Sequence, residues 1–289
     1  MLEQIHEILF EKKILDKNET IQNYSLLSDK YNVNTNYLET NKKKYILKTQ
    51  NKINNQLPTL KNIYHDLRIL PLFSLGIYYC DQNMCLMEYI ENDKYEINTN
   101  QTEITAKNLV KLHSQTSKFF GYKFDTYLGD LIQNNSPNYN WCNFFLRQRY
   151  DFYLNKIKSR NYLSLELSRK LIGLRKTIKE RLLEPNMPGL IHGDMWLQNI
   201  LIKGNRVSRI IDPAVFYADT EYELAYIYQN GTFGKGFYER YNYYRPISEE
   251  FWNFKIYIYQ IIPLMQYTLL ESPIYLKEIE KLIDLIDKN

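Results

Sequence analysis

Three oxygen-bearing side chains stand at a spacing that suits phosphoryl transfer. Asn199 follows Asp194 by five residues, and a second aspartate, Asp212, follows after a short polar turn. In such a set the first aspartate orients or deprotonates an acceptor hydroxyl, while the asparagine and second aspartate hold Mg²⁺ against nucleotide phosphates. A hard cation prefers oxygen ligands, and it offsets the charge that spreads over the phosphoryl group in the transition state. We therefore expect Asp194 to be catalytic, and Asn199 and Asp212 to be metal ligands.

The residues between Asn199 and Asp212 predict a β-hairpin. An apolar run at 200–202, a turn at Gly204 and a second apolar run ending at residue 211 would return Asp212 to the side of Asn199. A single Asp or Asn in a loop is more often a turn residue or a helix cap, so the interpretation depends on the combination. For His192 we favour a hydrogen bond to the loop backbone over a role in proton transfer.

Two earlier segments have the character of a nucleotide site. Lys48 ends the strand-like run that starts at Tyr45, where a lysine suits contact with the α- and β-phosphates, although an exposed lysine at a strand end is also common. Residues 84–90, MCLMEYI, predict a strand that runs into a connector. There we expect the carbonyl of Glu88 and the amide of Ile90 to pair with adenine, with Met87 beside them.

The elements that must position these residues change in character along the chain. A short helix is expected at 3–13, strands at 23–28, 33–39, 44–49, near residue 77 and at 85–89, and a helix at 55–70; later helices are expected around 106–113, 143–158, 163–183, 257–270 and at the C-terminus, with a small β insert at 189–217. This order predicts an α+β, two-lobed protein-kinase-like fold. Residues 1–90 would form a small N-terminal nucleotide-binding lobe, an antiparallel sheet with one main helix. Residues 91–289 would form a larger, mostly helical catalytic and substrate-binding lobe.

Composition excludes several classes of partner. The net charge is +4, from 37 basic and 33 acidic residues, which is too mild to argue for nucleic acid, and we expect Lys42 to Lys44 to form a solvated turn. The three cysteines match no zinc or haem spacing, so reduced thiols are expected. The charged N-terminus does not resemble a signal peptide, and the apolar stretch 257–270 is too short to span a bilayer. We expect a cytoplasmic protein without a membrane partner; the oligomeric state stays open.

Longer motifs carry a resemblance to a family. LIHGDMWLQNI at 190–200 and IIDPAVFYADTEYELA at 210–225 resemble the fructosamine kinase (ketosamine kinase) family, in the aminoglycoside phosphotransferase and choline kinase branch of the kinase fold. Segments 120–149 and 231–238 are also similar. The resemblance implies ATP and Mg²⁺, a small-molecule or glycated-amine substrate, and the roles given above for Asp194, Asn199, Asp212 and Lys48. It also implies that Trp196 faces the acceptor, unless it packs under the loop, and that Asp219 meets a substrate ammonium, unless it caps a helix.

Two departures from the family pattern leave alternatives open. The first glycine of the chain is Gly76, so the turn at 27–32 that should cover the phosphates contains none. The helix at 55–70 has no glutamate to pair with Lys48, and Gln56 and Asp66 are the replacements at hand. One alternative is a kinase for another small hydroxyl acceptor, such as an aminoglycoside, choline or a sugar. The other is a degenerate kinase that binds a nucleotide without turnover.

Overall fold

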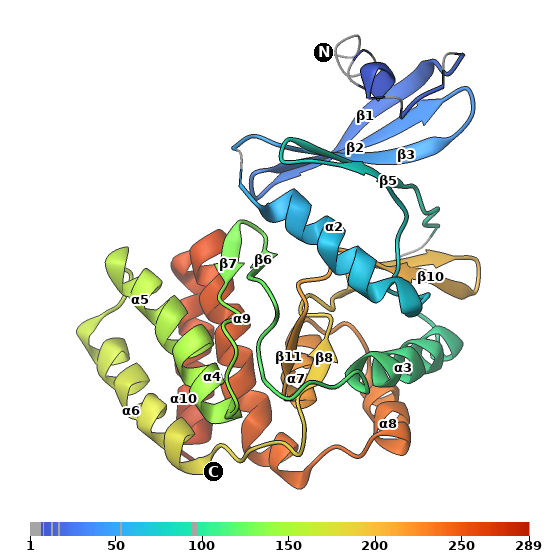
Figure 1. The fold of residues 1–289 in the computed structure, drawn as a ribbon. Helices are drawn as coiled ribbons and strands as arrows, with labels where there is room; N and C mark the ends of the chain where they lie inside the picture. Colours follow the sequence, from blue (N-terminus) through green and yellow to red (C-terminus); the bar gives the residue numbers. More distant parts are fainter. Residues whose placement is uncertain are drawn as a thin grey trace.

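The chain folds into a sheet-rich part and a larger helical part, with the sheet at the top of Figure 1 and the helices beneath. The computed structural model describes residues 7, 9–12, 14–16, 18–52, 54–93 and 97–288, so the helix expected at 3–13 lies largely outside the described residues. Five antiparallel strands form the sheet in the order β1-β2-β3-β5-β4. They are β1 Ile21–Lys30, β2 Val33–Thr40, β3 Lys44–Gln50, β4 Ile77–Cys80 and β5 Met84–Glu88, and α2, Gln56–Asp66, packs against them. The predicted α+β, kinase-like fold is confirmed.

The side-chain alternation of β3 decides which way Lys48 points. Tyr45 and Leu47 are buried in one core beside Leu38. Ile46, on the opposite face, packs with α2. Because successive side chains of a strand point to opposite faces, Lys48 shares the face of Ile46 and lies on the same side of the sheet as α2. The expected turn at Lys42 to Lys44 is also found, with all three side chains exposed between β2 and β3.

The helical part surrounds a single large core. Its helices are α3 Thr99–His113, α4 Trp141–Phe144, a π-helical turn Phe145–Asp151, α5 Phe152–Ser159, α6 Leu165–Arg181, α7 Thr220–Gln229, α8 Lys235–Tyr244, a second π-helical turn Phe251–Lys255, α9 Ile256–Leu270 and α10 Leu276–Ile286. The expected helices at 143–158, 163–183 and 257–270 are therefore present. Helix α9 is apolar on all sides because α5, α7 and α10 pack around it. Helix α9 therefore lies in the centre of the helical part, with most of its side chains buried.

Short strands complete the helical part near the interface with the sheet. They are β6 Thr126–Leu128, β7 Leu131–Gln133, β8 Gly189–Ile191, β9 Ile200–Lys203, β10 Arg206–Ile210 and β11 Phe216–Ala218, in three two-stranded sheets. Strands β9 and β10 form the predicted hairpin. The connector from β5 is tied to this hairpin, since Asp93 N donates to Ile202 O at 2.8 Å and Ile202 N donates to Asn92 Oδ1 at 3.0 Å. The β insert thus lies directly below the connector between the two parts.

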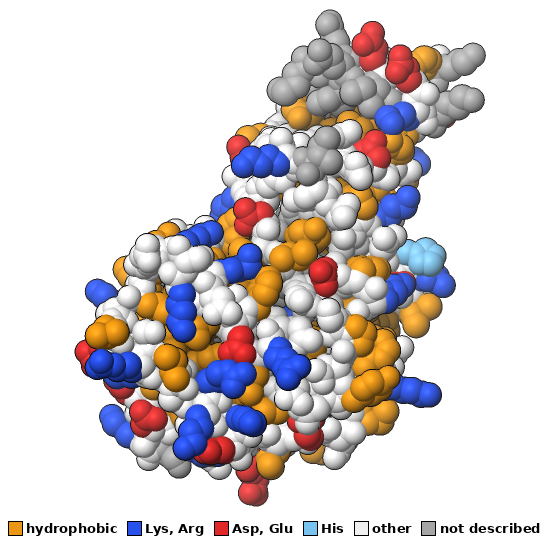
Figure 2. Space-filling view, turned by 60° about the vertical axis from the view of Figure 1, so that its left-hand side comes forward, with side chains coloured by type: hydrophobic (Ala, Val, Ile, Leu, Met, Phe, Trp, Pro, Cys, Tyr) orange, Lys and Arg blue, Asp and Glu red, His pale blue; other side chains and the backbone are white. Residues whose placement is uncertain are grey.

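The surface agrees with the mild net charge. On the face shown in Figure 2, basic side chains over the helical part are interspersed with acidic ones and with apolar ones. Within the described residues, no helix has both the length and the apolar character needed to cross a membrane.

Candidate active site

The hairpin brings the predicted chemical residues together. Asn199 Nδ2 donates to both the backbone oxygen and Oδ2 of Asp194, each at 2.9 Å. The Ile211 amide donates to the carbonyl of Asn199 at 2.8 Å, which places Asp212 next to Asn199. From β3, Lys48 Nζ lies 2.5 Å from Asp212 Oδ1. The structure therefore gathers Lys48, Asp194, Asn199 and Asp212 at the junction of the two parts.

The oxygens left at this junction match the ligands of a hard cation. Asp212 Oδ2 and Asn199 Oδ1 accept no hydrogen bond from any residue in the described ranges. The amide nitrogen of Asn199 is turned to Asp194, so its carbonyl oxygen is the group left for a metal. One carboxylate and one amide oxygen suit Mg²⁺, which takes its other ligands from water and phosphates. Over the same residues there is no cluster of three or more His, Cys, Asp or Glu side chains that would suit a transition metal.

Helix α2 reaches the site through Tyr64. The Asp212 amide donates to the Tyr64 hydroxyl at 3.0 Å, and Tyr64 is only 2% exposed. This bond supports a strained backbone, because Asp212 has a φ of 55°, in the left-handed region that non-glycine residues rarely adopt. Sequence reasoning missed Tyr64, since one tyrosine among 27 carries no motif.

Neither replacement expected for the missing glutamate pairs with Lys48. Gln56 donates to the carbonyl of Gly129 at 2.7 Å. Asp66 accepts from the Tyr122 hydroxyl at 2.6 Å and from Lys123 at 2.7 Å. Lys48 is held by Asp212 instead, with its side chain 12% exposed.

Replacing Tyr64 by phenylalanine is expected to loosen Asp212. The substitution removes the only acceptor found among the described residues for the partly buried Asp212 amide, which costs roughly 1 kcal/mol. We expect KM for MgATP to rise about tenfold, with a smaller change in KM for the acceptor. Steady-state kinetics with each substrate varied in turn measure the difference. Equal changes in both KM values would argue against this role.

Asp194 has a tyrosine as its second hydrogen-bond partner. The Tyr226 hydroxyl, from α7, donates to Asp194 Oδ1 at 2.5 Å. The pKa of Asp194 is raised to about 7. Burial is the largest cause and the negative charge of Asp212 adds to it, while the hydrogen bonds from Tyr226 and Asn199 act in the opposite direction. A carboxylate that titrates near neutrality is suited to accept a proton. A cation bound at Asp212 would favour the ionised form of Asp194.

The loop that carries Asp194 is anchored from beneath by Glu223 of α7. Its two oxygens accept from the amides of His192, at 3.0 Å, and Gly193, at 2.7 Å. Oε2 also lies 2.9 Å from His113 Nε2 in α3. Glu223 and His113 are at most 1% exposed. The loop is therefore fixed by a buried carboxylate of α7, which sequence reasoning did not identify as part of the site.

The backbone of the loop requires a glycine at position 193, and the His192 side chain hydrogen-bonds to the same loop. Gly193 has a φ of 83°, and a Cβ there would lie 2.3 Å from the carbonyl oxygen of Ala214. His192 Nδ1 accepts from the Asp194 amide at 3.3 Å. His192 thus makes the hydrogen bond to loop backbone that we favoured for it.

The stability of the fold is expected to fall as the pH drops below about 6.5, because His113 is buried in its neutral form. Burial lowers the pKa of His113, although the neighbouring Glu223 raises it. Below the unfolded-state pKa the unfolded chain takes up a proton that the folded chain does not, so stability falls by at most about 1.4 kcal/mol per pH unit for this group. Urea unfolding at pH 7.5, 6.5 and 5.5 measures the slope. In His113→Gln the slope is expected to be smaller; an unchanged slope would contradict this assignment.

The two expected substrate contacts differ in position. Trp196 is half-buried beside Asp194, with its amide donating to the Asp194 carbonyl at 3.2 Å, and it pairs with no aromatic ring in the described part of the chain. Asp219 is only 2% exposed. Its Oδ1 caps α7 through the Glu221 amide at 3.0 Å, and Oδ2 accepts from Lys255 at 2.9 Å and from Tyr259 at 2.7 Å. A substrate ammonium at Asp219 does not agree with this burial, and the capping alternative fits it.

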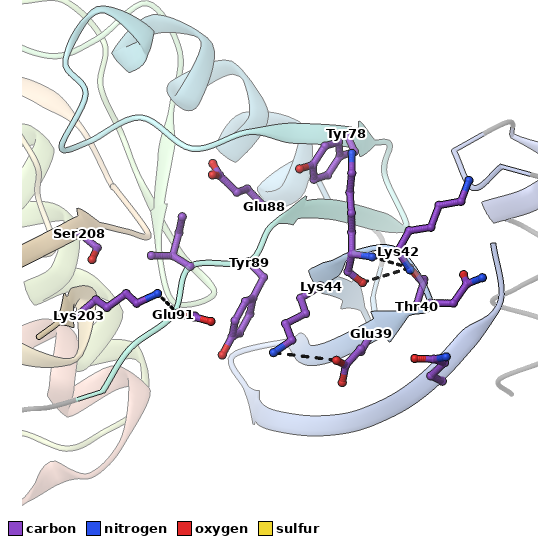
Figure 3. A pocket seen from close by; sticks show the side chains of 14 residues that line it. Glu39, Thr40, Lys42, Lys44, Tyr78, Glu88, Tyr89, Glu91, Lys203 and Ser208 are labelled. Carbon is purple, nitrogen blue, oxygen red and sulfur yellow. Dashed lines mark hydrogen bonds and ion pairs between the residues drawn. The ribbon is translucent and has the colours of Figure 1, made fainter.

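In the connector after β5, one backbone amide is left without a partner in the described part of the chain and could donate to a ligand. Met87 is 1% exposed and packs under α2. Both the amide and the carboxylate of Glu88 bond to Gly76, at 2.8 and 3.1 Å. The Ile90 amide makes no hydrogen bond to any described residue. A groove of about 740 Å³ beside the connector is lined by Glu39, Lys44 and other residues shown in Figure 3, but by none of the four gathered at the junction.

The turn between β1 and β2 forms without glycine. Tyr31 and Asn32 have φ values of 52° and 69°, the positive values that a two-residue type I′ hairpin turn requires. Asparagine tolerates this region, and the Asn32 side chain is fixed by Lys52, accepting from its amide at 2.6 Å and donating to its carbonyl at 2.8 Å. The absence of glycine therefore does not prevent the turn.

Comparisons with known proteins agree on one family. The model of a family described as fructosamine kinase matches residues 4–289. A protein of Enterococcus faecium named "Probable ketoamine kinase" is 29% identical over 201 residues, 69% of this chain and 70% of its own length. A Mus musculus "Ketosamine-3-kinase" is 35% identical over 144 residues, 49% of this chain and 45% of its own length. A crystal structure from Thermobifida fusca assigned to the fructosamine-3-kinases is 20% identical, with a TM-score of 0.82 over 94% of this chain and 95% of that one.

Proposed function

The chain belongs to the fructosamine kinase family, and on that basis we propose that it phosphorylates a sugar hydroxyl of a ketosamine with ATP. The acceptor would be a fructosamine or ribulosamine adduct, as in protein deglycation. The names of the relatives favour this class over aminoglycosides, choline or simple sugars. The observation that carries the proposal is the gathering of Lys48, Asp194, Asn199 and Asp212 at one junction.

We assign the following roles to these residues. Asp194 takes the proton of the acceptor hydroxyl as that oxygen attacks the γ-phosphorus. Lys48 leaves Asp212 and balances the charge of the α- and β-phosphates, while Ile90 and Glu88 pair with adenine and Met87 shapes the wall behind it. Trp196 stacks on the sugar or its amine. Residues 1–90 then act as the nucleotide-binding lobe and residues 91–289 as the catalytic lobe.

The metal in this proposal is Mg²⁺, held by Asn199 and Asp212. Both side chains present oxygen atoms without another partner in the described ranges, which is what this ion prefers. Such an ion would supply positive charge that offsets the negative charge of the phosphate groups during transfer. We also propose a cytoplasmic location, in keeping with three free cysteines, Cys80, Cys85 and Cys142.

An acceptor panel tests the proposal. ADP release is measured with fructoselysine, ribuloselysine, an aminoglycoside, choline and free fructose, each at equal concentration. We expect the highest kcat/KM with one of the two ketosamines. A higher value with any other acceptor would assign the chain to a different substrate, and nucleotide binding without turnover on the whole panel would identify a degenerate kinase.

A further inference from the structure

The turn between β1 and β2 crosses to the helical part and contacts it beside Asp194. The Tyr31 ring lies against Gly129, where an added Cβ would be 2.9 Å from Tyr31 Cγ, and the same Cβ would be 3.2 Å from Leu270. The Tyr31 hydroxyl donates to Glu271 Oε1 at 3.0 Å. The Asn32 side chain is bonded to the backbone of Lys52, and this fixes the turn that directs the Tyr31 ring toward Gly129.

Glu271 is exposed, and within the described ranges the side chains that hydrogen-bond to its carboxylate are tyrosines. Its second oxygen accepts from the Tyr275 hydroxyl at 2.7 Å. No lysine or arginine of the described ranges forms an ion pair with it. It stands at the C-cap of α9, where the Tyr267 carbonyl accepts from the Glu271 amide at 2.8 Å and the Leu269 carbonyl accepts from Arg160 at 2.6 Å. The carboxylate therefore carries a charge that the described part of the chain does not neutralise.

A continuous set of contacts joins Glu271 to the catalytic position. The Tyr275 ring lies 5.4 Å from the Tyr267 ring, centroid to centroid. The Tyr267 hydroxyl donates to the Tyr226 hydroxyl at 3.1 Å, and Tyr226 donates to Asp194 at 2.5 Å. Glu271 and its tyrosines are thus linked to Asp194 through neighbouring side chains.

A carboxylate framed by aromatic rings is a chemical match for an organic cation. The rings of Tyr31, Tyr267 and Tyr275 offer negative faces, and Glu271 offers a charge-assisted acceptor. We propose that these four residues, which we call the amine subsite, bind the protonated amine of the acceptor while its sugar lies at Asp194. The inference builds on the proposed function, since a ketosamine carries a basic nitrogen next to its sugar.

The test compares an acceptor that has a charged nitrogen with one that has a neutral nitrogen. One is the fructosamine of a simple alkylamine, and the other is its N-acetyl derivative, which keeps the sugar but has a neutral nitrogen. Binding is measured by calorimetry in the presence of Mg²⁺ and a non-hydrolysable ATP analogue, and turnover by ADP release. Glu271→Gln removes the charge and keeps the shape. Tyr31→Leu removes a ring face, and Glu278→Gln, on α10, is the matched surface control, its partner there being Lys281.

We expect Glu271→Gln to weaken binding of the charged acceptor about tenfold, with kcat and KM for ATP nearly unchanged. Tyr31→Leu is expected to weaken it about threefold, in line with the loss of one cation–π contact. The neutral acceptor should bind alike to wild type and both variants, and Glu278→Gln should match wild type throughout. Equal affinity of wild type and Glu271→Gln for the charged acceptor, or no binding to wild type, would overturn the amine subsite. Binding that depends on Glu271 without turnover would overturn the proposed function and leave the subsite standing.

Discussion

Asp194→Asn is expected to lower kcat by about 1,000-fold while leaving the affinity for MgATP within about threefold, the usual loss when a general base is removed. Asparagine keeps the size of the side chain, and its single oxygen can accept one of the two hydrogen bonds from Tyr226 and Asn199. The loop backbone stays bonded to Glu223, so the loop geometry should persist. Asparagine cannot take a proton from the acceptor hydroxyl. The phosphate contact proposed for Lys48 and the Mg²⁺ ligands proposed at Asn199 and Asp212 do not include the carboxylate oxygens of Asp194, so nucleotide binding is the internal control.

Two measurements separate this outcome from a folding defect. Thermal unfolding of Asp194→Asn should lie close to wild type, and calorimetric titration with MgATP should give a similar Kd. A matched variant, Asp151→Asn, changes an aspartate that pairs with Arg175 on the helical part instead of lying at the junction, and it should retain wild-type kcat. Turnover by Asp194→Asn above about one tenth of the wild-type value would remove Asp194 from the chemistry.

Glu223→Ala is expected to cost roughly 3–5 kcal/mol of stability, because it removes the partner of several buried groups at once. The amides of His192 and Gly193 would lose their acceptor, and His113 would lose its carboxylate. Burial opposes ionisation of Glu223, but the hydrogen bonds that it accepts from His113 and from the loop backbone at His192 lower the pKa of this carboxyl. The native state therefore contains a carboxylate that its surroundings stabilise.

Chemical denaturation of the full chain measures this loss. Glu278→Ala is the control, since that glutamate is exposed and pairs only with Lys281, so its change should stay within about 0.5 kcal/mol. Glu223→Gln is expected to fall between the two, because its amide oxygen can serve one loop amide but not both. A Glu223→Ala protein as stable as Glu278→Ala would show that the loop does not depend on this anchor.

The gathering of Lys48, Asp194, Asn199 and Asp212 was predictable because it follows from short stretches of sequence. The spacing of Asp194 and Asn199, and the apolar runs before Asp212, determine a hairpin whose ends must meet. Alternation along β3 likewise determines the side on which Lys48 emerges. These inferences need only backbone periodicity and hydrogen-bond pairing between neighbouring segments.

The supporting residues were not predictable for the opposite reason. Tyr64 and Tyr226 reach the site from helices far away in the sequence, and their role depends on how α2 and α7 pack. Asp219 was ambiguous because a residue that starts a helix can cap it or face a ligand. Lys255, more than 30 residues away in the chain, forms an ion pair with the buried Asp219 carboxylate. This pairing favours the capping role over contact with a ligand. The position of Lys255 follows only from the packing of the second π-helical turn, Phe251–Lys255, beside α7.

The most direct test of the central claim is the identity of the phosphorylated product. Wild-type protein is incubated with MgATP and fructoselysine, and the acceptor is isolated and examined by phosphorus NMR and mass spectrometry. The account predicts a new phosphate monoester on a sugar hydroxyl, formed in proportion to ADP and absent with Asp194→Asn. Phosphate found on the amine, an unmodified acceptor beside released ADP, or the same product from Asp194→Asn would contradict it.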